Sequence, residues 1–256
     1  MYLKKILQKY KAKDLADYVD SISALKKNLK MWANSCYIEI LESGSKAKGT
    51  AISLSSDVDY LVSLKSSCNE NNGGLQSIYN SLYMSLNENY SNIRKQNVSI
   101  RININGLKVD ITPARKQPGN TNDHNLYVSK TDTWKKTNIQ KHISDVSQSR
   151  RTNEIKLLKI WRELNNLDFP SIYVEYLTIN NILLGKYTND QYLNENFLCI
   201  LSKLGEDEKN PLFTEIVDPA NSNNILSDLL NTTEKKKIIS AAKKARNQKY
   251  WENIVW

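Results

Sequence analysis

The stretch SGSKAKGTAISLSSDVDYLVSL, residues 43–64, places two acidic residues at the start of an apolar run. Its second half, DVDYLVSL, has the apolar and β-branched residues of a buried β-strand, yet Asp57 and Asp59 stand at its beginning. Side chains two apart on a strand point to the same face, so the two carboxylates lie close together. Like charges at that spacing destabilise a strand unless a cation neutralises them. A divalent cation is the natural partner, because Mg²⁺ binds proteins through one or two carboxylates together with substrate phosphates.

The stretch VSIRININGLKVDITP, residues 98–113, predicts a β-hairpin that supplies a third carboxylate. Apolar and polar residues alternate on both sides of Asn105-Gly106, a dipeptide that favours a two-residue type I′ turn. Asp110 falls on the polar face of the second strand of this hairpin. On a strand next to the first, it would complete a site for two divalent ions, Mg²⁺ or Mn²⁺, about 3.5–4 Å apart.

Gly44 and Ser45 fit the same site. They follow a strand predicted over 36–44 and precede a short helix predicted over 46–49. Glycine allows backbone amides to approach a phosphate, and a serine hydroxyl beside a helix N-terminus can help to bind it. Each signal is weak alone, since Gly-Ser is a common dipeptide and Asp-x-Asp is often only part of a turn. The combination at this spacing is what indicates a phosphate site next to the carboxylates.

The chain has 256 residues, of which 40% are hydrophobic and 25% charged, as is typical of a soluble globular protein. Of its net charge of +9, most is concentrated in residues 101–162, which contain 13 Lys and Arg against 5 Asp and Glu. Such an excess indicates either a polyanionic partner, such as nucleoside triphosphates or nucleic acid, or a solvated basic surface. The first ten residues lack the apolar run of a signal peptide, and no stretch has the roughly 18–20 apolar residues of a membrane span, so no membrane partner is expected.

The cysteines and histidines are too few and too scattered to form a metal or catalytic cluster of their own. Cys36, Cys68 and Cys199 are odd in number and include no C-x-x-C, which argues against a disulfide framework or a zinc site. This usage fits a reducing compartment, and a cytoplasmic location is expected. His124 and His142 are isolated, which argues against a Ser-His-Asp triad.

The hydrophobic pattern predicts an α+β fold with two parts, a mixed helix-and-strand part over 1–137 and a helical part over 138–256. We expect a small mixed sheet with helices in the first part, packed on a helical bundle. Residues 114–137 look irregular, and everything beyond 138 looks helical. The predicted helices are 3–16, 21–34, 75–90, 138–148, 152–166, 170–186, 189–204, 224–231 and 233–254.

A strand followed by Gly-Ser, then Asp-x-Asp on a second strand and an Asp on a third, resembles the signature of DNA polymerase β-like nucleotidyltransferases. Further along, the chain is similar to the CD-NTases, the bacterial relatives of oligoadenylate synthetases and cyclic GMP-AMP synthase. The resemblance covers nearly the whole chain, and is more specific at the catalytic motifs than in the helical half. It rests on LKVDITPA (107–114), TWKKTN (133–138), EIKLLKIWRELNN (154–166), FPSIYVEYLT (169–178) and the C-terminal residues 238–256.

This resemblance assigns roles to individual residues. Lys156 and Lys159 could instead belong to a solvated helix face, and Ser171, after Pro170, could simply begin a helix. Relatives often place a base-stacking aromatic just after the position of Ser171, whereas this chain has Ile172. The implied site consists of Asp57, Asp59 and Asp110 as catalytic metal ligands, Gly44 and Ser45 on the β- and γ-phosphates, Lys159 or less strongly Lys156 on the triphosphate, and Ser171 as its hydrogen-bond partner.

The resemblance implies that 1–137 is the catalytic core, 138–256 a helical domain that binds nucleotide or substrate, and that the active-site cleft lies between them. It further implies a metal-dependent enzyme that joins nucleoside triphosphates without a template and releases pyrophosphate. The product would be a cyclic or short linear oligonucleotide signal for bacterial antiviral defence, acting on a downstream effector protein. One alternative is a terminal nucleotidyltransferase that modifies a nucleic-acid 3′ end or a protein side chain. Another is a non-catalytic nucleic-acid-binding relative, which the intact set of three aspartates disfavours.

Overall fold

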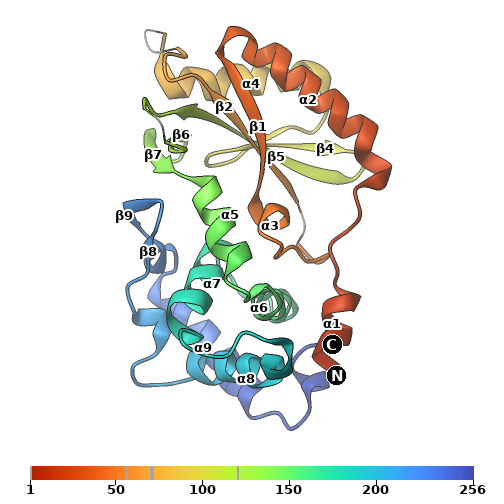
Figure 1. The fold of residues 1–256 in the computed structure, drawn as a ribbon, viewed down its shortest axis with the longest axis vertical. Helices are drawn as coiled ribbons and strands as arrows, with labels where there is room; N and C mark the ends of the chain where they lie inside the picture. Colours follow the sequence, from red (N-terminus) through yellow and green to blue (C-terminus); the bar gives the residue numbers. More distant parts are fainter. Residues whose placement is uncertain (1, 56, 70–71, 120) are drawn as a thin grey trace. The chain divides into compact units, whose positions relative to one another are not determined.

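The computed structural model describes residues 2–55, 57–69, 72–119 and 121–256 (Figure 1). The chain forms two compact units, each assembled from separate stretches of sequence, and we call them the helical unit and the sheet unit. The helical unit comprises Met1–Lys13, Lys48–Ser56 and Ser144–Trp256, and the sheet unit comprises Asp14–Ala47 and Asp57–Ile143.

The sheet unit is built on a mixed β-sheet, so the predicted α+β fold class is confirmed. Its strands are β1 (Tyr37–Ser43), β2 (Val58–Leu64), β3 (Arg94–Lys95), β4 (Ile100–Ile104), β5 (Leu107–Lys116), β6 (His124–Val128) and β7 (Thr133–Thr137). Strands β2 and β5 are parallel neighbours in the order β1-β2-β5-β4-β3, while β1 and β4 pair antiparallel with them. Strand β6 pairs with the end of β5 and with β7.

Two amphipathic helices, α2 (Val19–Ala33) and α4 (Gly74–Asn89), lie along one face of this sheet (Figure 1). In α2, Leu25 and Leu29 recur at helical spacing and are fully buried. Alternate residues of β2, β4 and β5 face them, because side chains on a strand point to opposite faces in turn. Removing this apolar layer from water is the main stabilising contribution of the sheet unit. The opposite face of β2 and β5 carries Asp59 and Asp110 at one end and a smaller apolar cluster around Leu61 and Ala114 further along.

The hairpin β4–β5 forms around Asn105 and Gly106, both of which have positive φ, as the two-residue turn requires. A second hairpin, β6–β7, occupies part of the stretch 114–137, so the expectation that this stretch is irregular is wrong. Thr133 and Trp134 of β7 are exposed at the margin of the sheet. Thr137 alone of β7 is buried, and the strand shows no alternation of apolar and polar residues by which the sequence could reveal it.

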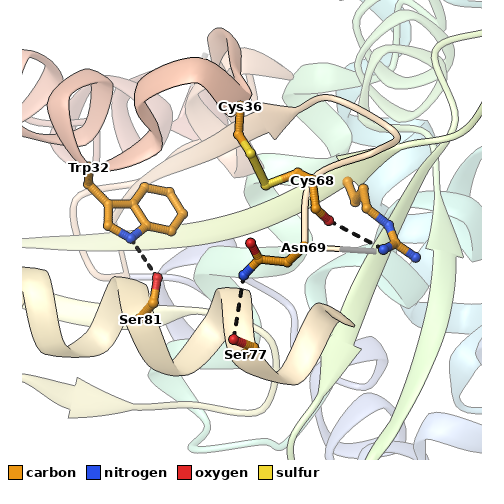
Figure 2. Close-up of a disulfide and its surroundings, with 7 residues drawn as sticks. Trp32, Cys36, Cys68, Asn69, Ser77 and Ser81 are labelled. Atoms are coloured by element: carbon orange, nitrogen blue, oxygen red, sulfur yellow. Dashed lines mark hydrogen bonds between the residues drawn. A yellow bond between two sulfur atoms is a disulfide. The ribbon is translucent and has the colours of Figure 1, made fainter. Parts of the chain in front are cut away.

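Cys36 and Cys68 form a disulfide in the sheet unit, with their Cα atoms 5.5 Å apart (Figure 2). The antiparallel pairing of β1 with β2 places Tyr37 opposite Leu64, so the residues just outside the strand ends meet. The expectation from sequence that the cysteines stay unpaired is therefore wrong for these two. They are 32 residues apart, and only the pairing of the two strands brings them together.

Because this disulfide closes a loop across two strands, we expect it to stabilise the sheet unit. Cys36→Ser should lower the free energy of unfolding by about 2–4 kcal/mol under non-reducing conditions, as is typical for such a cross-link. Urea unfolding with and without reductant measures this effect. The free Cys199 provides the control, since Cys199→Ser should behave like the unmodified chain in both buffers. An unfolding midpoint of the unmodified chain that reductant leaves unchanged would contradict the prediction.

The helical unit packs its helices around a second apolar core. At its centre, Leu157, Leu158 and Trp161 are fully buried. Residues Val217–Asp218 (β8) and Asn221–Ile225 (β9) pair as a short antiparallel ribbon, so the expectation of an all-helical second half is wrong there. The helices that contribute to the helical unit include α1 (Tyr2–Lys9), α5 (Ile139–Gln148), α6 (Thr152–Leu164), α7 (Ser171–Leu177), α8 (Leu193–Leu204) and α9 (Thr232–Arg246).

The chain passes between the two units more than once, which a single boundary between 137 and 138 does not describe. Helix α5 begins in the sheet unit and continues into the helical unit after Ile143. The segment 48–56 belongs to the helical unit because Ile52 packs in its core, although the residues on both sides of it belong to the sheet unit. Among the described residues, no helix is both long and apolar enough to cross a membrane.

Candidate active site

Asp59 and Asp110 lie opposite each other on the parallel strands β2 and β5. On the other side of β2, Asp59 is in register with Ser43, the last residue of β1. Asp57 immediately precedes β2, and all three carboxylates are half-buried. They occupy the sheet face opposite α2 and α4, because their neighbours Val58 and Val109 are buried on the helix side. The structure thus brings together the three aspartates that the sequence singled out.

Arg101 on β4 joins two of these carboxylates. Its Nε donates a hydrogen bond to Oδ1 of Asp110 at 2.8 Å, and its Nη2 donates to Oδ2 of Asp110 at 2.7 Å. Nη2 also donates to Oδ2 of Asp57. The side-chain amide of Gln96 adds a hydrogen bond to Oδ1 of Asp110 at 2.7 Å. A bidentate guanidinium–carboxylate pair is among the stronger polar contacts in proteins, so the orientation of Asp110 is well defined.

These contacts set the charges in the site. Burial raises the pKa of Asp57, the Arg101 guanidinium opposes this effect, and the nearby carboxylate of Asp110 adds to it. The hydrogen bond to Asp110, together with the surrounding carboxylates, raises the pKa of Arg101 further above its usual range. Arg101 is therefore a permanent positive charge between Asp57 and Asp110.

Gly44 is the first residue of the short helix α3 (Gly44–Ala47), and its backbone lies against the side chain of Asp59. A Cβ placed on Gly44 would lie 1.8 Å from Oδ2 of Asp59, and the backbone φ of +65° is in the left-handed region. Only glycine fits both constraints without strain. The backbone and hydroxyl of Ser45 come next in α3, so the residues predicted to bind phosphate adjoin the carboxylate cluster.

Lys159 lies in the core of the helical unit and does not belong to a solvated helix face. Its side chain is 2% exposed, and Nζ donates to Oε1 of Glu175 at 2.7 Å and to Oγ1 of Thr50 at 2.9 Å. Lys48 donates to Oε2 of the same carboxylate at 2.8 Å. Burial alone would raise the pKa of Glu175, but the two ammonium groups lower it to about 2, so Glu175 stays ionised. This cluster ties the segment 48–56 to α6 and α7.

Lys156 and Ser171 also belong to the helical unit. Lys156 is half-buried on α6, and burial lowers its pKa. Ser171 is the first residue of α7, and its Oγ accepts a hydrogen bond from Nη1 of Arg162 at 3.0 Å. Arg162 also donates to the carbonyl of Phe169 at 2.7 Å, so it holds the start of α7 against α6. The contacts of Lys156, Lys159 and Ser171 with a triphosphate stay predictions.

A family model for the Second Messenger Oligonucleotide or Dinucleotide Synthetase (SMODS) domain matches residues 2–149, which is more than half of the chain. The chain belongs to the SMODS family. It is therefore a nucleotidyltransferase of the kind that makes nucleotide second messengers, and the resemblance to CD-NTases is confirmed. A search of curated proteins gave no match.

Solved structures share the fold of this SMODS protein. The CdnC:HORMA-deltaN complex of E. coli MS115-1 matches with a TM-score of 0.73 at 20% identity, covering 96% of this chain and 88% of the other. The CdnE cyclic dinucleotide synthase of Elizabethkingia meningoseptica, solved with GTP and Apcpp, matches with a TM-score of 0.69 at 13% identity, covering 99% and 98%. A cytoplasmic RNA terminal U-transferase matches with a TM-score of 0.63 at 11% identity, covering 98% and 94%. At these identities the likeness concerns the fold.

The donor groups of the SMODS site suit the divalent ions that the family implies, because carboxylate oxygens are the ligands that Mg²⁺ and Mn²⁺ prefer. Oδ2 of Asp57 and Oδ2 of Asp110 are close enough to share one nitrogen of Arg101. Within the described part of the chain, however, no three acidic, cysteine or histidine side chains already surround a common point as a metal site. The oxygen ligands are therefore of the type that these ions bind, and Arg101 contacts two of the three carboxylates, Asp57 and Asp110.

Arg101 is the site residue that sequence reasoning missed, although the hairpin contained a signal for it. A two-residue turn at Asn105-Gly106 pairs Ile104 with Leu107, and therefore pairs Arg101 with Asp110 three steps further along. Opposite charges at directly paired positions on one face attract each other. The register set by the Asn-Gly turn therefore identifies Arg101 as the cross-strand partner of Asp110.

Proposed function

We propose that this protein joins nucleoside triphosphates, without a template, into a cyclic or short linear oligonucleotide and releases pyrophosphate. The observation that carries the proposal is the register of Asp59 with Asp110, beneath Gly44 and beside Asp57. This arrangement gathers three carboxylates at one place on the sheet and puts the start of a helix directly over them. Carboxylates for divalent ions and backbone amides for phosphates are the groups that nucleotidyl transfer needs.

In this proposal, Asp57, Asp59 and Asp110 hold two divalent ions, Mg²⁺ or Mn²⁺. Such ions, when bound, supply Lewis acidity to the attacking and leaving oxygens and neutralise charge on the phosphates. The amide of Gly44 and the hydroxyl of Ser45 bind the β- and γ-phosphates. Lys156, Lys159 and Ser171 are proposed as further contacts to the triphosphate, and Lys159 would have to exchange its bonds to Glu175 and Thr50 for this role.

The chemical step is an in-line displacement at the α-phosphorus of the bound triphosphate. The oxygen of an attacking ribose hydroxyl forms a bond to this phosphorus while the bond to the bridging oxygen of pyrophosphate breaks. We assign Asp110 as the group that assists deprotonation, so that the hydroxyl proton passes to a carboxylate oxygen. Asp110 is suited to this because the side-chain amide of Gln96 fixes its orientation while Asp57 and Asp59 form the other side of the site.

The base that the enzyme selects is not set by an aromatic ring after Ser171. Tyr173 is fully buried and its hydroxyl donates to the carbonyl of Leu212 at 3.0 Å, which excludes it as a surface for base stacking. Ile172 is partly buried against the same core. We infer that base selection relies on other contacts.

Incubation of the pure protein with labelled ribo- or deoxyribonucleoside triphosphates and Mg²⁺ or Mn²⁺ tests the proposal. Separate reactions contain no acceptor, single-stranded RNA, single-stranded DNA or a protein acceptor. The proposal expects small oligonucleotide products and pyrophosphate without any acceptor. Label that appears only on added nucleic acid or protein would contradict it.

That contrary outcome corresponds to a second candidate function, a terminal nucleotidyltransferase. Its support is the shared fold with the cytoplasmic RNA terminal U-transferase and the basic stretch 101–162, which suits a long polyanion. The family match favours the first candidate, because it names synthesis of second messenger oligonucleotides or dinucleotides.

A signal of this kind needs a protein that responds to it, so we propose a downstream effector and a role in bacterial antiviral defence. One structural neighbour, CdnC, was solved in a complex with a HORMA protein. By analogy, we also propose that this chain binds a partner protein. Co-purification from its native cells would test this.

A further inference from the structure

We propose that Arg101 is an internal counter-ion that occupies the place of a dication between Asp57 and Asp110 and withdraws when metal and nucleotide bind. This inference rests on the proposed function, because it assigns a positioning role to a residue in contact with the metal-binding carboxylates. Arg101 would decide when the site accepts metal, and would take no part in bond making.

The first observation is that one atom serves both acids. Nη2 of Arg101 donates to Oδ2 of Asp57 and to Oδ2 of Asp110, two carboxylates that lie on different segments of the chain. A dication that bridged the same two oxygens would need the space that Nη2 takes. The two arrangements exclude each other, since a cationic nitrogen and a metal ion cannot lie between the same pair of oxygens.

The second observation is that Arg101 can move without disturbing the sheet. Its side chain is 28% exposed, so solvent borders it, and its backbone is held in register between β3 and β5. Because the guanidinium is rigid and planar, Nη2 and Nε leave the carboxylates together, through a change of rotamer of the whole side chain. A long side chain attached to a fixed strand is suited to alternate between two positions.

The third observation is the balance of charge. Asp59 and Asp110 are opposite each other on β2 and β5, and Asp57 is two residues before Asp59. Like charges placed this close repel one another. Arg101 neutralises part of this charge when no metal is bound and so stabilises the three carboxylates at this place in the sheet. The cost is competition with any metal that arrives alone, whereas a metal carried by a triphosphate adds contacts through its phosphates that favour the exchange.

The test measures Mn²⁺ binding without nucleotide, by electron paramagnetic resonance of the free ion, and thermal unfolding in chelator. Arg101→Gln should bind Mn²⁺ about tenfold more tightly than the unmodified chain, since the cation that contacts both Asp57 and Asp110 and takes the place of the metal is removed. In chelator the same variant should unfold at a lower temperature. Arg94→Gln is the matched control, because it changes the net charge of the protein by the same amount. Arg94 is exposed on β3, opposite Arg101 on β4, so this variant should leave the Mn²⁺ affinity unchanged.

Arg101→Lys provides a second variant in case the glutamine variant does not fold. Lysine keeps the positive charge but cannot make the two-nitrogen pairing with Asp110. This variant should therefore bind Mn²⁺ about threefold more tightly than the unmodified chain. If Arg101 only orients Asp110 for metal binding, both variants would bind Mn²⁺ with equal or lower affinity, and the inference would be overturned.

The Asp59→Asn variant separates this inference from the proposed function. If it removes Mn²⁺ binding while the Arg101 variants fail to tighten it, the counter-ion role is wrong and the metal site stands. If it binds Mn²⁺ as well as the unmodified chain does, the aspartates are not the metal site, and both the counter-ion role and the proposed metal chemistry are wrong.

Discussion

Asp110→Asn should reduce nucleotidyl transfer by at least about 100-fold, because a divalent ion contributes several kcal/mol to the transition state and each 1.4 kcal/mol is a factor of ten in rate. The change keeps the size of the side chain but removes the charge that we propose binds metal and accepts the hydroxyl proton. It also removes the charge that pairs with Arg101. The measurement is the initial rate of pyrophosphate release at saturating nucleoside triphosphate and Mg²⁺.

Asp20→Asn is the matched control, since Asp20 is exposed on α2 in the same unit and should leave the rate unchanged. The thermal midpoint of each variant shows whether a loss of activity reflects a loss of folding. Undiminished turnover of a folded Asp110→Asn variant with normal triphosphate binding would rule out the role assigned to Asp110.

Glu175→Gln should destabilise the helical unit by about 3–5 kcal/mol, which is the usual effect of removing one partner from a buried ion pair. Glu175 is fully buried and accepts hydrogen bonds from Lys48, Lys159 and Thr50. The amide cannot neutralise the two ammonium groups, so they are left buried without their counter-charge. Urea unfolding followed by circular dichroism measures the change, and Glu195→Gln on the exposed surface of α8 should stay within about 0.5 kcal/mol.

The same pair of chains gives a test by pH. The pKa of Glu175 is about 2 in the folded chain, against 4.5 for an unperturbed glutamate, so its charge contributes stability that is fully present above about pH 4.5. This contribution is lost as pH falls toward 2, because the folded carboxyl then takes up the proton that the unfolded one already carries. The difference in unfolding free energy between the unmodified chain and Glu175→Gln should therefore shrink below pH 4.5. A constant difference down to pH 2 would contradict the ion cluster.

The elements that the sequence predicted well are those where a local rule and burial agree. The Asn-Gly turn sets the β4–β5 hairpin, and the alternation of the flanking residues puts Asp110 on the polar face. The apolar residues after Asp59 form β2, and the helical spacing of Leu25 and Leu29 forms α2. In each case the residues that give the pattern are also those that bury the element, so the local signal and the tertiary structure point to the same answer.

The features that the sequence did not reveal depend on contacts between distant residues or show no apolar alternation. Only Thr137 of β7 is buried, and the disulfide between Cys36 and Cys68 exists only because β1 pairs with β2. The sequence leaves Lys159 open as a phosphate contact or a solvated residue, because its partners Glu175 and Thr50 come from separate parts of the chain. No spacing rule along one helix predicts such a cluster, since a buried lysine is stable only when tertiary structure supplies its counter-charge.

We propose that Asp57, Asp59 and Asp110 make this member of the SMODS family a template-independent synthase of a nucleotide signal. The sharpest test is mass spectrometry of acceptor-free reactions of the pure protein with all four ribonucleoside triphosphates and Mg²⁺, with the Asp59→Asn variant run in parallel. We expect a phosphodiester-linked product of a few nucleotides, with one pyrophosphate released for each bond formed, from the unmodified chain and none from the variant. An equal yield from both proteins, or product only as an extension of added RNA, would contradict it.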